Sequence, residues 1–144
     1  MKSIRTLLEK KGAQVWSIGP KASVLDAIKA MAEKGIGALP VMEGDELLGI
    51  ISERDYARKV ILEDRSSKDT LVEDIMTKKV ICARKSQQVE ECMAIMMNGN
   101  FRHMPVVEDG KVVGVLSLRD LVKVVIAEQQ FTIEQLESYI AVSY

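Results

Sequence analysis

The sequence lacks an excess of either charge. Its 144 residues include 20 Lys and Arg against 21 Asp and Glu, for a formal net charge of −1, and no long block carries one sign. A surface that binds a polyanion needs clustered basic residues. We therefore expect no nucleic-acid partner.

Long apolar runs are absent as well. The first stretch, MKSIRTLLEKKG, is charged throughout and has no apolar core of the kind that a secretion signal needs. No run approaches the roughly 20 apolar residues of a membrane-spanning helix. The sequence predicts a cytoplasmic protein with no membrane partner.

Residues that carry catalysis or redox chemistry are few. Cys82 and Cys92 lie in apolar segments without CxxC spacing, so we expect buried, reduced thiols. His103 is the only histidine, and its neighbours offer no metal-ligand set. The chain has no GxxxxGK[ST] loop, no GxGxxG and no recognisable nucleophile-base arrangement. We expect no enzymatic activity, no metal and no catalytic cofactor.

The chain does contain a long internal repeat. A shift of 65 residues lays 15–63 over 80–128 without a gap, with 13 identical residues in 49 positions. The repeat includes GIISERD at 49–55 and GVLSLRD at 114–120. A period this long indicates two copies of a whole lobe.

Each copy predicts the same order of elements, β-α-β-β-α. Apolar residues at helical spacing and paired apolar strands around a Gly-containing turn support this order. The expected strands are 14–18, 38–42 and 47–51, then 80–83, 103–107 and 112–116; the expected helices are 23–34 and 86–98, with further helices beginning at Ser52 and Ser117.

One lobe of this size would leave a sheet face poorly covered, so we expect the two lobes to pack as a pseudo-twofold pair. The fold class is α/β (α+β), and 47% hydrophobic residues suffice for its core. The expected divisions are an N-terminal helix at 1–13, a first repeat at 14–63, a linker at 64–79, a second repeat at 80–128 and a C-terminal helix at 129–144.

Each repeat contains an S-x-x-D motif with an Arg before the Asp, as in Ser52, Arg54 and Asp55. In one interpretation, the Ser caps a helix and the Asp completes a capping box. In the other, the carboxylate accepts hydrogen bonds from a ribose diol and the Arg binds a phosphate. The motif alone leaves both interpretations open.

The segments GIGALPVMEGDELLGIISERD and NFRHMPVVEDGKVVGVLSLRD each resemble the end of a CBS domain, and VEDIM resembles the usual joint between two such domains. The resemblance covers about 15–128 and implies tandem CBS domains packed as a Bateman module. It further implies a homodimer that forms a four-CBS disc. Its implied ligands are adenosine compounds: AMP, ADP, ATP or NAD(H), with S-adenosylmethionine less expected here.

The resemblance also implies roles for individual residues. Asp55 and Asp120 would bind ribose, and Ser52 and Ser117 would lie near phosphate. The adenine would lie against two pairs of apolar residues, Ile18 with Val41 and Ala83 with Val106.

Carried through the repeat, the resemblance implies two unequal clefts. The first joins Asp120, Ser117, Arg119, Arg102 and His103 with Ile18, Lys21 and Ser23. The second joins Asp55, Ser52 and Arg54 with Ala83, Arg84 and Gln88. The first is richer in phosphate partners, so the sequence places the nucleotide there first.

Two functions remain after this reasoning. In the leading one, a nucleotide binds between the lobes and an unidentified regulated protein senses the change in geometry. In the alternative, the chain is a protein-interaction or scaffold homodimer with empty or vestigial clefts. The alternative is supported by apolar stripes in the two end segments: Ile4, Leu7 and Leu8, then Ile133, Leu136 and Ile140.

Overall fold

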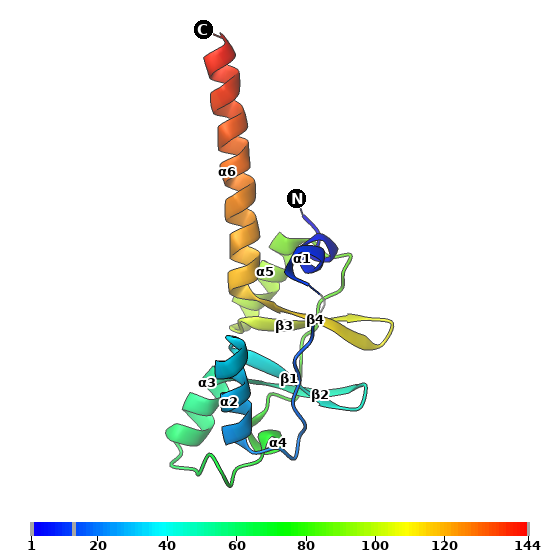
Figure 1. The fold of residues 1–144 in the computed structure, drawn as a ribbon, viewed down its shortest axis with the longest axis vertical. Coiled ribbons are helices and arrows are strands. Elements are labelled where there is room, and N and C mark those ends of the chain that lie inside the picture. Colours follow the sequence, from blue (N-terminus) through cyan, green and yellow to red (C-terminus); the bar gives the residue numbers. More distant parts are fainter. Residues whose placement is uncertain (1, 13, 144) are drawn as a thin grey trace.

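The structure is a computed structural model that describes residues 2–12 and 14–143, with side chains described as far as residue 140. Residues 1, 13 and 144, which belong to the predicted end segments, lie outside it. Two lobes are stacked along the long axis of the molecule, and one long helix projects from the second lobe (Figure 1).

Apart from the first strand of each repeat, the two lobes contain the predicted elements in the predicted order. The first lobe consists of α2 (Val24–Lys34), β1 (Ala38–Glu43), β2 (Glu46–Ser52), α3 (Glu53–Tyr56) and the π-helix η1 (Ala57–Ile61). The second consists of α5 (Val89–Gly99), β3 (His103–Glu108), β4 (Lys111–Ser117) and α6 (Leu118–Ser143). Helix α1 (Ile4–Lys11) precedes the first lobe, and helix α4 (Val72–Ile75) lies in the linker between the two lobes.

The two hairpins match each other residue for residue. Pro40 lies opposite Ile50 in the first and Pro105 opposite Val115 in the second, and in each hairpin the strand register shifts directly after the Pro-Val pair. The predicted hairpins are thus confirmed. The predicted first strands are reduced to single parallel bridges, from Ile18 to Val41 and from Ala83 to Val106.

The predicted helices differ from the structure at two places. The helix predicted from residue 86 begins at Val89, with Gln88 as its N-cap residue. The prediction that a separate C-terminal helix begins at residue 129 is wrong, because α6 runs without a break from Leu118 to Ser143. The segment 118–143 contains no Gly or Pro that would end a helix.

Each lobe has its own core, and each core is completed by a segment from outside the repeat. Val72 and Ile75 of α4 are buried in the core of the first lobe. Ile4, Leu7 and Leu8 of α1 are buried in the core of the second lobe. The apolar stripe of α1 therefore packs within the chain, and α1 does for the second lobe what α4 does for the first.

The repeated glycine of the two motifs lies where these outside segments cross the hairpins. A Cβ on Gly49 would lie 2.7 Å from both the Thr77 carbonyl oxygen and the Met76 sulfur. A Cβ on Gly114 would lie 2.7 Å from Leu8 Cδ2 of α1. The motif begins with glycine because a neighbouring segment packs directly on the strand.

Candidate functional site

Both S-x-x-D motifs form capping boxes. The Ser52 hydroxyl oxygen accepts from the Asp55 amide at 3.1 Å, and Asp55 Oδ2 accepts from the Ser52 amide at 3.0 Å. Ser117 and Asp120 make the same two bonds at 3.1 and 3.0 Å. The capping interpretation is confirmed, and in Asp55 it uses one carboxylate oxygen, which leaves the other for a second partner.

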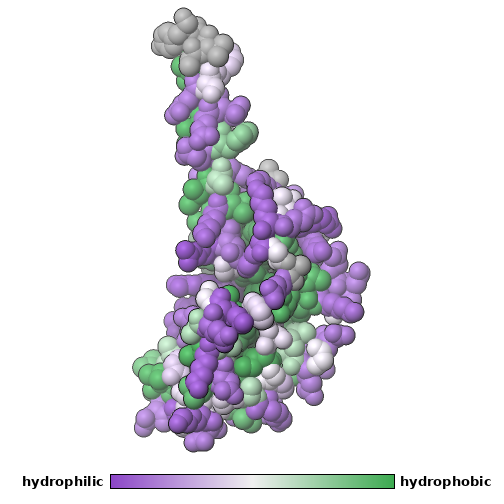
Figure 2. Space-filling model, viewed as in Figure 1, coloured by the Kyte–Doolittle hydropathy of each residue, from purple (hydrophilic) through white to green (hydrophobic). Residues whose placement is uncertain are grey.

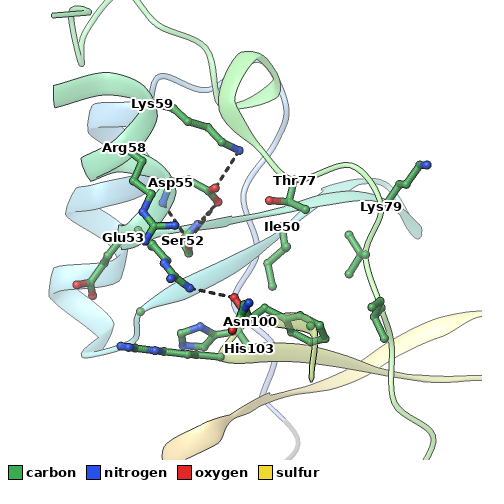
Figure 3. Close-up of a pocket in the computed structure, with 17 residues that line it drawn as sticks. Ile50, Ser52, Glu53, Asp55, Arg58, Lys59, Thr77, Lys79, Asn100 and His103 are labelled. Atoms are coloured by element: carbon green, nitrogen blue, oxygen red, sulfur yellow. Dashed lines mark hydrogen bonds and ion pairs between the residues drawn. The ribbon is translucent and has the colours of Figure 1, made fainter. Parts of the chain in front are cut away.

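A pocket of about 700 Å³ lies between the two lobes beside Asp55. Figure 3 shows it bounded by the start of α3 on one side and by Asn100 and His103 of the second lobe on the other. This volume is in the ordinary range for small-molecule sites. The lining residues are Gly37, Ile50, Ser52, Glu53, Arg54, Asp55, Arg58, Lys59, Thr77, Lys79, Val80, Ile81, Gly99, Asn100, Phe101, Arg102 and His103.

The second oxygen of Asp55 is held by a lysine that also lines the pocket. Lys59 Nζ lies 3.0 Å from Asp55 Oδ1 and donates to the Ile75 carbonyl at 2.8 Å (Figure 3). Lys59 follows Asp55 by one helical turn, so both side chains project from the same face. A ligand hydroxyl that donates to Oδ1 would compete with Lys59 for that oxygen.

Positive charge predominates in the pocket. Its lining includes the five cationic side chains of Arg54, Arg58, Lys59, Lys79 and Arg102, against two acidic ones, Glu53 and Asp55. Arg54 donates to the Asn100 carbonyl at 2.9 Å and so bridges the two lobes. Among the residues that the structure describes, Arg58, Lys79 and Arg102 form no ion pair with a carboxylate. This composition favours an anionic ligand.

One wall of the pocket is apolar. Ile50, Val80, Ile81 and Phe101 contribute to it, and Ile81 is exposed. A Cβ on Gly99 would meet the Phe101 ring, so any side chain there would require the ring to move. An aromatic ring with an aliphatic wall is a suitable surface for a planar base.

His103 lies at the boundary between the lobes. A Cβ on Gly37, in the first lobe, would lie 3.2 Å from the His103 ring. Burial lowers the pKa of His103, and the nearby cations Lys11 and Arg102 lower it further, while Asp120 acts in the opposite direction. His103 is therefore more strongly neutral at pH 7 than an exposed histidine.

This pKa direction predicts how stability depends on pH. Because the folded-state pKa of His103 lies below the unfolded value of 6.5, stability is fully present above pH 6.5 and declines as the pH falls below it. The excess loss is at most about 1.4 kcal/mol per pH unit. We expect thermal melts at pH 7 and pH 5 to show a smaller decrease in Tm for His103→Gln than for the unsubstituted protein. Equal decreases would contradict the assignment.

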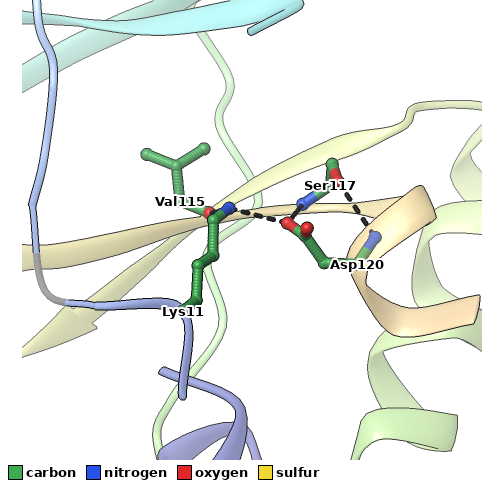
Figure 4. A network of polar contacts seen from close by, with 4 residues as sticks. All are labelled: Lys11, Val115, Ser117 and Asp120. Carbon is green, nitrogen blue, oxygen red and sulfur yellow. Dashed lines mark hydrogen bonds and ion pairs between the residues drawn. The ribbon is translucent and has the colours of Figure 1, made fainter. Parts of the chain in front are cut away.

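The second motif, at Asp120, is closed by α1. Lys11 Nζ lies 2.6 Å from Asp120 Oδ2 and donates to the Val115 carbonyl at 2.7 Å (Figure 4). In the first lobe, the equivalent carbonyl of Ile50 accepts from the Thr77 amide at 2.8 Å. Lys11 thus takes a position on the second hairpin that the linker backbone takes on the first.

The contact with Lys11 also affects the titration of Asp120. Burial raises the pKa of Asp120, but the hydrogen bonds from Lys11 and from the Ser117 backbone outweigh it, so the pKa lies below its ordinary value. The carboxylate is ionised and already carries an ammonium partner. A ligand that bound Asp120 would share the carboxylate with Lys11, whose ammonium lies on Oδ2 together with the Ser117 amide.

The structure groups the predicted residues differently from the two predicted clefts. Arg102 and His103, predicted to act with Asp120, line the pocket beside Asp55. The reason is that β3 begins next to the equivalent strand of the first lobe, where His103 packs on Gly37. The sequence placed Arg102 and His103 in the Asp120 cleft as phosphate partners. In the structure they lie in the pocket beside Asp55 instead.

Lys21 and Ser23, predicted to complete the Asp120 cleft, contact other groups. Lys21 pairs with Glu73 of α4 at 2.7 Å. The hydroxyl of Ser23 caps α2 by accepting from the Asp26 amide at 3.1 Å. Neither residue lines the pocket, and both serve the junction with the linker.

The remaining predicted residues also lie outside the pocket lining. Val41, Ala83 and Val106 lie beside their predicted neighbours but have side chains buried in the lobe cores, and Ile18 packs on the first core. Arg84 and Arg119 are exposed. Gln88 is the N-cap residue of α5 and has a buried oxygen without a hydrogen-bond partner.

Sequence reasoning missed much of the lining. Arg58 and Lys59 could have been found, because they follow Asp55 by three and four residues and so share its helical face. Lys79 lies in a segment interpreted as a linker, and Phe101 carries no local signal. Their part in the pocket depends on how the lobes pack.

The other expectations about reactive groups can be compared with the structure. Cys92 is buried as expected, and burial raises the pKa of its thiol to about 11. Cys82, expected to be buried as well, is only half-buried; its partial burial raises its pKa. Across residues 2–12 and 14–143, no three His, Cys, Asp or Glu side chains form a group that could hold a metal ion. Within the same residues, no helix is both long and apolar enough to span a membrane.

Comparison with known sequences points to one family. The family model described as CBS domain matches residues 12–62 and 72–127. The mitochondrial CBS domain-containing protein CBSX3 of Arabidopsis thaliana is 40% identical over 127 residues, which cover 85% of this chain and 62% of that protein. The chain thus spans about three fifths of the length of this relative.

Solved structures point the same way. A protein with CBS domains from Burkholderia ambifaria is 51% identical, with a TM-score of 0.86, over 92% of this chain and 99% of that one. The CBS domain pair of protein MJ0100 is 25% identical, with a TM-score of 0.75, over 89% and 98% of the two chains. That pair was crystallised in complex with 5-methylthioadenosine and S-adenosyl-L-methionine.

Proposed function

This chain belongs to the CBS domain family, and from that premise we propose that it is a regulatory CBS pair that binds a phosphorylated adenosine compound in the pocket beside Asp55. The proposal rests mainly on one observation: the pocket combines a fixed carboxylate, five cationic side chains and an apolar wall containing Phe101. These are the groups that a ribose, phosphates and a base require, respectively.

Asp55 is the residue that we propose binds the ribose. Its Oδ2 stays bonded to the Ser52 amide, which fixes the carboxylate, while Oδ1 exchanges Lys59 for a ribose hydroxyl. The released ammonium of Lys59 remains in the pocket lining, where it is available to a phosphate. The capping box and the binding site thus use the same residue through different oxygens.

The charge of the pocket favours ligands with more than one phosphate. Among the described residues, Lys59 is the one cation of the five that has a carboxylate partner; the other four have none. Charge-assisted bonds to phosphate are about twice as strong as neutral ones. ADP, ATP and NAD(H) fit this pocket better than AMP does. The pair in MJ0100 binds two adenosine compounds without phosphates, so we expect the two proteins to differ in ligand preference.

We propose that the Asp55 pocket is occupied before the Asp120 cleft. The Asp120 carboxylate holds Lys11 at 2.6 Å, and Arg102 and His103 lie in the other pocket. This order reverses the expectation from the sequence. The reversal follows from the position of α1, which the repeat does not include.

The output of the module remains a proposal. Ligand binding would favour one arrangement of the lobes or of a four-CBS disc, and a regulated protein would sense it. A cytoplasmic location and the absence of catalysis also remain predictions; the plant relative carries a mitochondrial name. The scaffold alternative is weakened because the α1 stripe is buried, and it retains support from the exposed side chains of α6.

A ligand panel tests this function. At a ligand concentration of roughly 100 times Kd, binding stabilises the protein by about 2.7 kcal/mol, which raises Tm by several degrees. We expect ADP, ATP and NAD(H) to raise Tm more than AMP does, and adenosine and S-adenosylmethionine to raise it least. Added salt should shrink the differences. If no compound raised Tm at millimolar concentration, nucleotide binding would be excluded.

A further inference from the structure

His103 differs in kind from the other charged groups of the pocket. It is the only histidine in the chain, and the equivalent position of the first repeat holds Ala38. It begins β3 at the junction of the two lobes, where Figure 2 shows hydrophilic side chains on much of the visible surface. Histidine is the side chain that ordinarily gains or loses its charge between pH 5 and pH 8. The described lining therefore combines permanent charges with one group that responds to pH.

The ring edge that carries Nε2 faces the first lobe. A Cβ on Gly37 would lie 3.2 Å from both Nε2 and Cε1 of His103. Both residues line the pocket, and Gly37 has no side chain that could cover this edge. Within residues 2–12 and 14–143, no group forms a hydrogen bond with either ring nitrogen of His103. A proton on Nε2 thus has no acceptor among these residues, and a ligand in the pocket would supply one.

Charged groups approach the His103 ring from several elements. Arg102 precedes it, Lys11 approaches from the end of α1, and both cations oppose its protonation, whereas Asp120 of α6 favours it. Glu53 of α3 lies on the same side as the exposed ring edge, with Oε1 3.6 Å from the Cβ position considered above. Burial has the largest effect, and with the two cations it keeps the pKa of His103 below its ordinary value. The free protein therefore holds a neutral His103 beside a pocket rich in cations.

A phosphorylated ligand would reverse this balance. Its phosphates bring negative charge into the pocket and place oxygen acceptors beside the open ring edge. An opposite charge within about 4–6 Å favours the charged form of a titratable group. We propose that His103 takes up a proton from solvent when a phosphorylated ligand binds, and that the imidazolium donates from Nε2 to a phosphate oxygen. This proposal rests on the proposed function of the Asp55 pocket. It makes the affinity for the ligand rise as the pH falls.

Linkage between proton and ligand sets the size of this effect. His103 is neutral in both the free and the bound protein at high pH, and charged in both at low pH, so the affinity changes only in between. If the ligand raises the midpoint of the His103 titration by about one pH unit, binding is about tenfold tighter at the low end than at the high end. Between pH 8 and pH 6 we expect about half of this change, or about fivefold.

The first test follows His103 directly, because a single histidine gives a single set of ring signals. Proton NMR of the full chain, in a preparation without a histidine tag, measures the titration midpoint of the ring with and without millimolar ADP. We expect ADP to raise the midpoint by about one pH unit. An unchanged or lowered midpoint would overturn the proposal. This measurement needs no variant.

The second test measures ADP binding by isothermal titration calorimetry at pH 8 and pH 6. The terminal phosphate of ADP itself loses charge near pH 6, so the unsubstituted protein is compared with His103→Gln at the same pH. The ratio of the two Kd values, variant to unsubstituted protein, should be about fivefold larger at pH 6 than at pH 8. Thermal melts at both pH values check that the variant folds.

Arg102→Gln is the matched control. Arg102 lines the same pocket and precedes His103, but an arginine side chain keeps its charge over this pH range. Its loss should weaken ADP binding by a similar factor at both pH values. If ADP bound and the ratio for His103→Gln were the same at both pH values, proton uptake would be refuted and the proposed function would stand. If ADP did not bind the unsubstituted protein at either pH, both would be refuted.

Discussion

Replacing Asp55 with Asn is expected to weaken ADP binding by about a hundredfold. The substitution keeps the size of the side chain but removes the charge that accepts ribose hydroxyls, and each hydrogen bond to a charged group contributes about 1.5–3 kcal/mol. Oδ2 of Asp55 accepts a hydrogen bond in the capping box. Oδ1 pairs with Lys59, which also lines the pocket. Isothermal titration calorimetry measures the change, with melting curves to check that the variant folds.

Asp120→Asn is the matched control for this substitution. Asp120 has the same capping bonds at the equivalent helix start, so the two variants lose similar structural contacts. Because the pocket is lined by Asp55 and not by Asp120, Asp120→Asn should weaken ADP binding much less than Asp55→Asn does. Equal losses, or a greater loss for Asp120→Asn, would contradict the proposed order of the two sites.

Gly49→Ala is expected to lower the free energy of unfolding by about 2–3 kcal/mol. The new methyl group would lie 2.7 Å from the Thr77 carbonyl oxygen, which belongs to the backbone and is fixed by its bond to the Ile50 amide. Overpacking of this kind costs about 1–3 kcal/mol, and here a backbone hydrogen bond is strained as well. The corresponding decrease in Tm is about 5–10 °C by thermal melting.

Gly114→Ala tests whether the cost comes from this contact or from glycine itself. Its methyl group would meet Leu8 Cδ2, the end of a side chain that can turn away. We therefore expect a loss of about 1 kcal/mol or less. If the two variants lost equal stability, the crossing of the linker over the first hairpin would not be the reason for Gly49.

The local elements could be predicted because their signals are local. The two hairpins follow from apolar strands on either side of a short Gly-containing turn, and Ser52 with Asp55 follows from capping chemistry. Repetition at 65 residues strengthened each assignment, since both copies gave the same elements. The same capping box is present in the second copy, at Ser117 and Asp120.

The grouping of the pocket could not be predicted from the same signals. Arg102 and His103 face the first lobe because β3 begins beside Gly37, and this depends on how the lobes pack. Lys11 reaches Asp120 because α1 completes the core of the second lobe, although it precedes the first lobe in sequence. Alignment of one repeat on the other carries no information about a segment outside both repeats.

The length of α6 was missed for a different reason. The predicted boundary at residue 129 followed the end of the repeat, whereas a helix ends where its residues or contacts end it. No Gly or Pro interrupts the segment between Leu118 and Ser143. The heptad spacing of its isoleucines is visible in the sequence, but only the structure shows that these side chains are exposed.

A crystal structure of the full chain with ADP tests the central claim most directly. The account predicts ADP between the lobes, with a ribose hydroxyl within hydrogen-bond distance of Asp55, the phosphates among the cationic side chains, and Lys11 still bound to Asp120. ADP bound to Asp120 with Lys11 displaced and the Asp55 pocket empty would contradict it, as would ADP bound outside both sites.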